Sequence, residues 1–154
     1  ITYQAINFNT FYTGPGVTGP SPLMRNVHIK DVEIDGVPTA IELVGLPEKW
    51  LENIHLENIN VINSEKGARI TRVKGLKMTN VTINSEEQAM IAEDVYEIFL
   101  NNLTLNDGVS GKPFTLQGRH TGAIFTDDFP NNQIEFKDGL TKDIVKESPE
   151  VQAW

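Results

Sequence analysis

Residues Asn53–Val61 read NIHLENINV, and this stretch decides the fold because three others share its pattern. The others are Asn26–Ile34 (NVHIKDVEI), Gly75–Ile83 (GLKMTNVTI) and Glu97–Leu105 (EIFLNNLTL). All four fit one template, x-Φ-x-Φ-x-Asn-Φ-x-Φ, in which Φ is apolar and only Asp31 departs from Asn at the sixth place. The sixth places are separated by 27, 22 and 22 residues, so the middle of the chain is an internal repeat.

Each copy of the template predicts two short strands joined by a corner. Apolar residues alternate before the Asn and again after it, as in strands with one buried face, and the alternation slips at the Asn. Asn is the non-glycine residue that best tolerates the left-handed conformation that such a corner needs. Stacked about 4.8 Å apart, these amides would also form a hydrogen-bonded ladder. Asp31 has no side-chain donor, so we expect the ladder to be imperfect at that rung.

A third apolar segment follows each copy, at Ala40–Leu43, Ala68–Thr71, Ala89–Ala92 and Phe114–Leu116. Three short strands in every 22–27 residues predict an all-β protein, a parallel β-helix of several coils, and no long stretch keeps the helical period. We interpret residues 1–154 as one domain, with a first strand and loop start in 1–12, repeats in 24–122 and a tail in 123–154 that caps the stack. The only helix-like stretch is Thr141–Val151.

The composition excludes several classes of protein. The chain has 154 residues, no cysteine, and 13 Lys and Arg against 21 Asp and Glu, for a net charge of −8. The acid excess argues against a nucleic-acid partner, and the lack of cysteine excludes a disulfide framework, a thiolate metal site and a Cys nucleophile. A mean hydropathy of −0.27 and the lack of a long apolar run argue against a membrane span.

The N-terminal stretch from Ile1 alternates like a strand and has neither the basic nor the apolar region of a signal peptide. We therefore interpret the chain as a mature or trimmed piece of a longer protein. Several segments together resemble the C-terminal part of the polygalacturonases, the pectin-degrading β-helix enzymes of glycoside hydrolase family twenty-eight. The segments are Ala5–Tyr12 (AINFNTFY), Arg25–Val32, Thr39–Glu48 (TAIELVGLPE) and Glu52–Ile59. The likeness covers about residues 1–105 and is closest to bacterial exo-acting members.

The resemblance implies a right-handed parallel β-helix that hydrolyses α-1,4-galacturonan with inversion, using one carboxylic acid to protonate the leaving oxygen and one carboxylate to activate water. The family's Asn-Thr-Asp, Asp-Asp, Gly-His-Gly and Arg-x-Lys motifs all lie upstream of the segment that residues 1–12 match. We therefore expect no catalytic residue here and no activity from this chain alone. Tyr12 matches a family tyrosine that helps line the sugar site, so Tyr12 is the one substrate-binding candidate. The resemblance also implies a secreted or periplasmic location and no cofactor.

Other residues imitate functional motifs. Asp127-Asp128 follows the last repeat and precedes Phe-Pro, which is typical of a surface turn. Arg72–Lys74 spells Arg-x-Lys, and Arg69–Thr71 resembles that motif more weakly. Both follow the Gly-Leu-Pro-Glu turn, whereas the family's motif precedes it, so we interpret them as solvated face and turn. His120 lies between glycines and is interpreted as a loop residue.

Two pairs of residues occupy equivalent places in the repeat. His28 and His55 share one outward place a coil apart and should lie near each other, but the pattern places no third metal ligand, so we interpret them as solvent-exposed histidines without a metal. Asn80 and Asn102 match the glycosylation sequon, yet they are ladder residues and are assigned to that role.

A non-catalytic module for carbohydrate binding or assembly is the alternative function, and it explains the missing acid pair without a missing half. The first coil has no visible cap, and an uncapped β-helix end invites association. We therefore expect a partner there: the missing N-terminal half, a nicked companion chain or a second copy. Galacturonan is the expected polysaccharide partner in the context of a longer chain.

Overall fold

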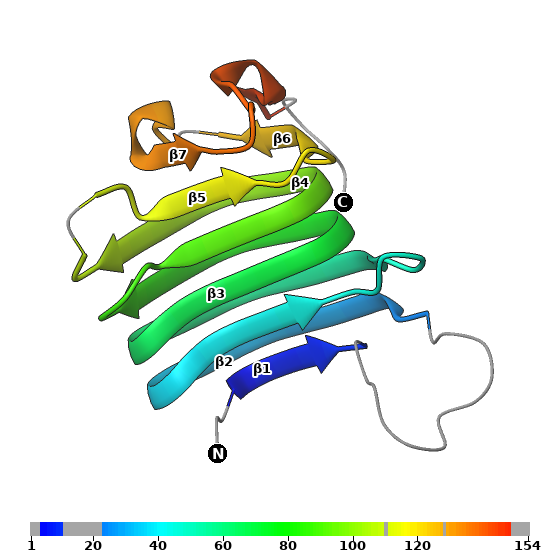
Figure 1. The fold of residues 1–154 in the computed structure, drawn as a ribbon. Helices are drawn as coiled ribbons and strands as arrows, with labels where there is room; N and C mark the ends of the chain where they lie inside the picture. The colour runs from blue at the N-terminus through cyan, green and yellow to red at the C-terminus, as the bar shows by residue number, and fades with distance from the viewer. Residues whose placement is uncertain (1–3, 11–22, 110, 128, 149–154) are drawn as a thin grey trace.

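A computed structural model describes residues 4–10, 23–109, 111–127 and 129–148, and the chain winds into a parallel β-helix of about 5 turns (Figure 1). The described part contains the strands β1 (Gln4–Asn9), β2 (Arg25–Val44), β3 (Leu51–Ser85), β4 (Met90–Asp107), β5 (Phe114–Gln117), β6 (Gly122–Thr126), β7 (Ile134–Phe136) and β8 (Val145–Glu147). The long strands β2 to β4 bend around the corners of the coil. The prediction of an all-β parallel β-helix is therefore confirmed.

Successive coils pair in parallel, with a local irregularity of register around Asp35 in the pairing of β2 with β3. Strand β1 pairs with β2, β2 with β3, and β3 with β4. Strand β4 then pairs with both β5 and β6, β5 pairs with β7, and β6 pairs with β8. The stack therefore places side chains from equivalent positions of successive coils in columns, one coil about 4.8 Å from the next.

The template Asn forms the corner that the sequence predicts. Asp31, Asn58, Asn80 and Asn102 all have positive φ, between 52° and 59°. Two other columns of positive φ also bend the coil. One contains Asn26, Asn53, Gly75, Glu97 and Ala123, and the other contains Arg72, Asp94 and Gly118. The first of these additional corners begins each template copy and was not predicted.

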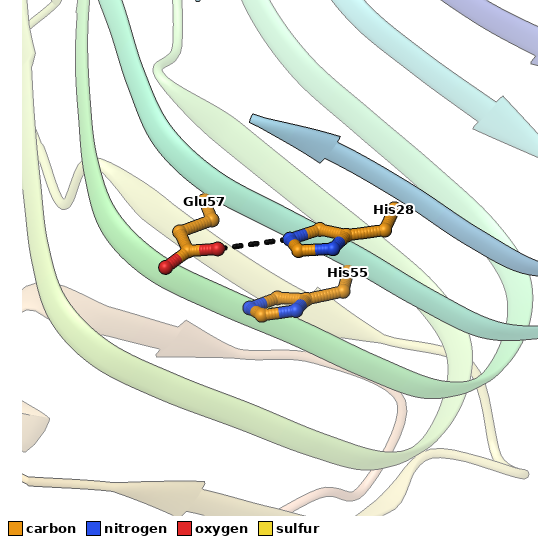
Figure 2. Close-up of side chains that lie close together, drawn as sticks. All are labelled: His28, His55 and Glu57. Carbon is orange, nitrogen blue, oxygen red and sulfur yellow. Dashed lines mark hydrogen bonds and ion pairs between the residues drawn. The ribbon is translucent and has the colours of Figure 1, made fainter. Parts of the chain in front are cut away.

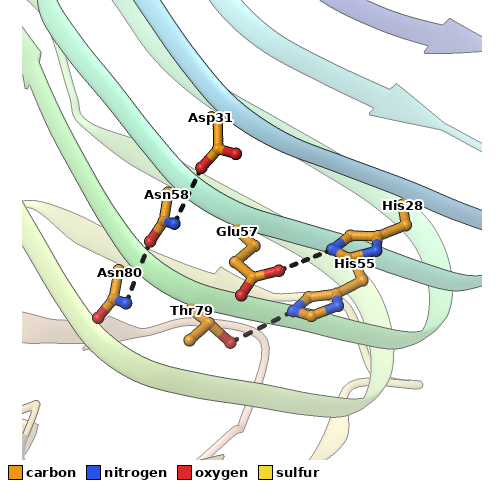
Figure 3. A network of polar contacts seen from close by, with 7 residues as sticks. All are labelled: His28, Asp31, His55, Glu57, Asn58, Thr79 and Asn80. Carbon is orange, nitrogen blue, oxygen red and sulfur yellow. Dashed lines mark hydrogen bonds and ion pairs between the residues drawn. The ribbon is translucent and has the colours of Figure 1, made fainter.

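The predicted amide ladder is present and runs in one direction (Figure 3). Asn102 Nδ2 donates to Asn80 Oδ1 at 2.7 Å, Asn80 to Asn58 at 3.1 Å, and Asn58 to Asp31 Oδ1 at 3.0 Å. The expectation of an imperfect rung at Asp31 is wrong. Each residue accepts from the following coil, so a carboxylate at the first rung serves as well as an amide.

The core is a set of apolar columns inside the coil. The four apolar places of the Asn53–Val61 copy, Ile54, Leu56, Ile59 and Val61, are each at most 1% exposed. Their equivalents in the next coil, Leu76, Met78, Val81 and Ile83, are fully buried. Burying each such side chain stabilises the fold by about 1.5–3 kcal/mol. The columns hold the register, so the outward residues between them are also fixed in place.

The segment after residue 122 continues the stack with β6, β7 and β8. The helix-like interpretation of Thr141–Val151 is wrong over its described part. Lys142–Ile144 form a single 3₁₀ turn and Val145–Glu147 form β8. Ile144 and Val145 pack against the core. The backbone hydrogen bonds that a helix would make within itself are made here by pairing with β6. No helix in the described part has the length and apolar character needed to cross a membrane.

Candidate functional site

A polar groove crosses the outward face of the sheet formed by the third segment of each coil. Glu42 of β2 pairs with Arg69 of β3, and Arg69 pairs with Ile91 of β4. Two residues along, Glu93 of β4 pairs with Gln117 of β5. These side chains line a cavity of about 500 Å³. The groove therefore presents two cations, Arg69 and Lys66, among three carboxylates and two amides, which are Glu42, Glu87, Glu93, Gln88 and Gln117.

Glu42 is held in place by the strand beneath it. Gln4 Nε2 donates to Glu42 Oε2 at 3.2 Å, and Asn9 Nδ2 donates to Glu42 Oε1 at 3.2 Å. Both amides come from β1, so each carboxylate oxygen accepts one hydrogen bond. On the far side of the groove, Gln88 Nε2 donates to Thr115 Oγ1. Each side of the groove is therefore tied to a neighbouring coil.

The carboxylates Glu42 and Glu93 of the groove lie on strands that are not adjacent. Glu93 lies two coils from Glu42 and two residues along the strand. These offsets place their Cα atoms about 12 Å apart. The groove offers charged and amide groups that can hydrogen-bond a polar ligand.

A second cluster lies on the outward face of the first segment of the coil, which is a different side of the stack (Figure 2). His28 of β2 pairs in register with His55 of β3, and their rings stack with centroids 4.3 Å apart and planes 6° apart. His28 Nε2 lies 2.9 Å from Glu57 Oε2, and His55 Nε2 lies 3.4 Å from Thr79 Oγ1. The cluster lines a depression of about 540 Å³ together with Lys77.

Burial lowers the pKa of His55, and the neighbouring His28 and Lys77 lower that pKa further while Glu57 opposes them. Burial also lowers the pKa of Lys77, against the effect of Glu57. The prediction that the two histidines lie close together is confirmed. Glu57, however, was missed. Two residues after His55 on a strand, it faces outward on the same side, and its register with Lys30 sets it beside His28.

The structure places the remaining sequence candidates as follows. Tyr12 lies outside the described residues, as does Asp128. Asp127 follows β6, and its Oδ2 accepts a hydrogen bond from the backbone N of Asn102 at 3.0 Å. Arg69 is exposed in the groove, whereas Arg72 Nε donates to the carbonyl oxygen of Gly45 at 2.6 Å.

The last sequence candidates lie at one turn and on the strands β3 and β4. His120 is exposed, and its backbone N donates to Asp94 Oδ1 at 3.3 Å. Asn80 and Asn102 are members of the amide ladder. Lys74 is exposed on β3. None of these residues joins the groove or the histidine cluster in the described structure.

Comparison with known proteins adds no assignment. No family model matches this chain, no curated protein matches it significantly, and no solved structure gives a significant match. The likeness to the polygalacturonases consequently rests on the quoted motifs, and the functional argument rests on the residues and geometry above.

Proposed function

We propose that this chain is the C-terminal portion of a polygalacturonase-like glycoside hydrolase and that it supplies part of the polysaccharide-binding face. The observation that carries the proposal is the groove in which Arg69 lies between Glu42 and Glu93, with Gln117 beside them. The parallel β-helix and the Gly45–Glu48 turn that follows the groove strand support it.

The groove chemistry suits an acidic sugar. A guanidinium binds a carboxylate through two parallel hydrogen bonds, so Arg69 is the natural partner of a uronate group. Carboxylates and amides accept hydrogen bonds from sugar hydroxyls, and this is the role of Glu42, Glu93 and Gln117. Glu42 is the best prepared of the three because two amides from β1 already fix its orientation.

Hydrolysis would depend on residues upstream of this chain. In the inverting reaction, an acid protonates the leaving oxygen while a carboxylate removes a proton from the attacking water. The chain has no Asn-Thr-Asp and no Gly-His-Gly sequence. This chain therefore binds and positions the polysaccharide, and the upstream half cleaves it.

The test compares two proteins for the release of reducing sugar from polygalacturonate: this 154-residue chain and a longer product that includes the upstream sequence. We expect activity from the longer product alone. In that product, Arg69→Ala should raise the KM for oligogalacturonate by at least about tenfold, since it removes a bidentate charged contact. Arg119→Ala, at an exposed turn outside the groove, is the matched control.

A non-catalytic carbohydrate-binding module is the second candidate. It is favoured by the lack of the Asn-Thr-Asp and Gly-His-Gly sequences in this chain, because a binding groove needs no lost half to explain that lack. The two functions give different outcomes. Oligogalacturonate binding that depends on Arg69, with no hydrolysis by the longer product, assigns the binding module. Activity in this chain alone would refute both and would make Asp127 and Asp128 the first residues to replace.

A further inference from the structure

We propose that His28, His55 and Glu57 form a binding site for a divalent transition-metal ion of the Zn²⁺ class. Their ligand atoms, two imidazole nitrogens and one carboxylate oxygen, all lie within 4.8 Å of one another. Two histidines and a glutamate are a known protein ligand set for Zn²⁺, in which the fourth position is left to water. The site lies on the first segment of the coil and is separate from the groove on the third segment.

The fold places these ligands before any ion arrives. His28 and His55 occupy equivalent positions of adjacent coils, and Glu57 follows His55 by two residues on the same outward face. Ile54 and Leu56, which alternate with these ligands, are buried in the core and fix the strand register. The site is therefore built on a rigid element, which keeps the cost of organising it low.

To admit an ion, ligand atoms up to 4.8 Å apart must approach one another, and the two stacked rings, now 6° from parallel, must turn so that the ion lies in the plane of each. Zn–N and Zn–O bonds of about 2.0–2.2 Å in tetrahedral geometry place ligand atoms about 3.3–3.6 Å apart. His28 Nε2 and Glu57 Oε2 are now 2.9 Å apart, so they would separate by about half an ångström and the ion would replace the hydrogen between them. The His28 and Glu57 side chains are 49% and 31% exposed, and this leaves room for the change.

The proton balance of binding is simple. His28 coordinates through Nε2 as the neutral ring with its hydrogen on Nδ1. Glu57 coordinates as the carboxylate. Thr79 Oγ1, which lies 3.4 Å from His55 Nε2, is placed to hydrogen-bond the water in the fourth position (Figure 3).

The charges around the site provide a second test, in which one substitution should strengthen metal binding instead of weakening it. Lys77 lines the same depression and occupies the position equivalent to His55 in the next coil. Lys30 pairs in register with Glu57 from the preceding coil. Both ammonium groups repel a cation, while Glu57 attracts it. Removal of the Lys77 charge should therefore tighten binding, and removal of the Glu57 charge should weaken it.

The experiment is a calorimetric titration of the metal-free full chain with Zn²⁺, with Co²⁺ absorbance as a reporter of four-coordinate geometry. We expect one ion per chain. His28→Ala, His55→Ala and Glu57→Gln should each weaken binding at least tenfold, because loss of even an outer partner of a ligand costs about 10–100-fold. His120→Ala is the matched control: it removes the third histidine of the chain, at an exposed turn, and should change nothing.

Circular dichroism identifies any variant that fails to fold. Lys77→Gln, which keeps all three ligands, should bind Zn²⁺ about threefold more tightly. The proposal is overturned if the chain does not bind Zn²⁺ below millimolar concentration, or if His120→Ala weakens binding as much as His28→Ala does. It is equally overturned if the folded ligand variants bind like the unchanged chain, or if Lys77→Gln binds no more tightly.

Discussion

Asn58 donates its side-chain Nδ2 to Asp31 Oδ1 at 3.0 Å, and the same Asn58 has a φ of 52°. The backbone of this one residue therefore forms the corner of its own coil, and its side chain hydrogen-bonds the preceding coil. Asn80 then donates to Asn58 Oδ1 at 3.1 Å and has a φ of 53°. Since both roles fall on the same residue type, the recurrence of Asn in the repeat has a structural cause.

Replacement of Asn58 should separate these two roles. Asn58→Gly removes both ladder hydrogen bonds but suits the positive φ, so we expect a loss of about 1–3 kcal/mol in the free energy of unfolding. Asn58→Ala also places a Cβ in the left-handed region and should lose about 1–2 kcal/mol more. Urea unfolding followed by circular dichroism measures both. An alanine variant more stable than the glycine variant would contradict the corner role.

Gly75 belongs to the unpredicted corner that begins each copy, and we expect Gly75→Ala to destabilise the fold through both strain and contact. Its φ is 76°, and a Cβ there would lie 2.8 Å from Asn53 Oδ1. Asn53 would then have to move, although its Nδ2 donates to Asn26 at 3.1 Å.

Gly36→Ala is the matched control, because Gly36 has a φ of 75° with nothing within 4 Å of the added Cβ. The control should cost about 1–2 kcal/mol from backbone strain alone. Gly75→Ala should cost about 1 kcal/mol more, since an intercoil hydrogen bond is disturbed. Equal losses in urea unfolding would show that Asn53 yields freely and that this second ladder contributes little.

The features of this fold that could be predicted from the sequence are those in which the same residue type recurs in each coil. The corner at Asn58 could be predicted because the same amide recurs and the apolar alternation slips beside it. The corner containing Asn53, Gly75 and Glu97 could not, because its residue types differ and only their backbone conformation is shared. The terminal strand at Val145–Glu147 was hidden for a similar reason: its pairing with β6 depends on the stack and not on a local pattern.

The histidine cluster was only partly predictable from the sequence, for a related reason. The equivalent places of His28 and His55 predicted their proximity without any structure. Glu57 shares their face by the period of two along a strand, but its approach to His28 depends on the register of β2 against β3. The groove was missed although Glu42 and Arg69 follow their template Asp31 and Asn58 by the same 11 residues, because no residue type recurs at that place from coil to coil.

Glu97 is less suited to its corner column than Asn53 or Gly75, and its replacement should stabilise the protein. Its φ is 58°, in a position where the two preceding coils use Asn53 and Gly75. Asn tolerates this conformation better than Glu, so Glu97→Asn should raise the free energy of unfolding by about 1 kcal/mol. Glu87→Asn removes a similar exposed acid without this backbone conformation and should leave stability within about 0.5 kcal/mol. If both variants gain equally, charge and not backbone strain is the cause.

The inward apolar columns make the largest contribution to the stability of the stack, and replacement of Leu56 tests this. This side chain is fully buried between the equivalent places of the adjacent coils, Ile29 and Met78. Leu56→Ala should lower the free energy of unfolding by about 2–5 kcal/mol, because the neighbouring coils cannot collapse into the space while their hydrogen bonds hold the spacing. Ile62→Ala, at a side chain 42% exposed, should cost much less. Since each coil contacts only its neighbours, a small loss at Leu56 would mean that the coils around it repack independently of the ladder.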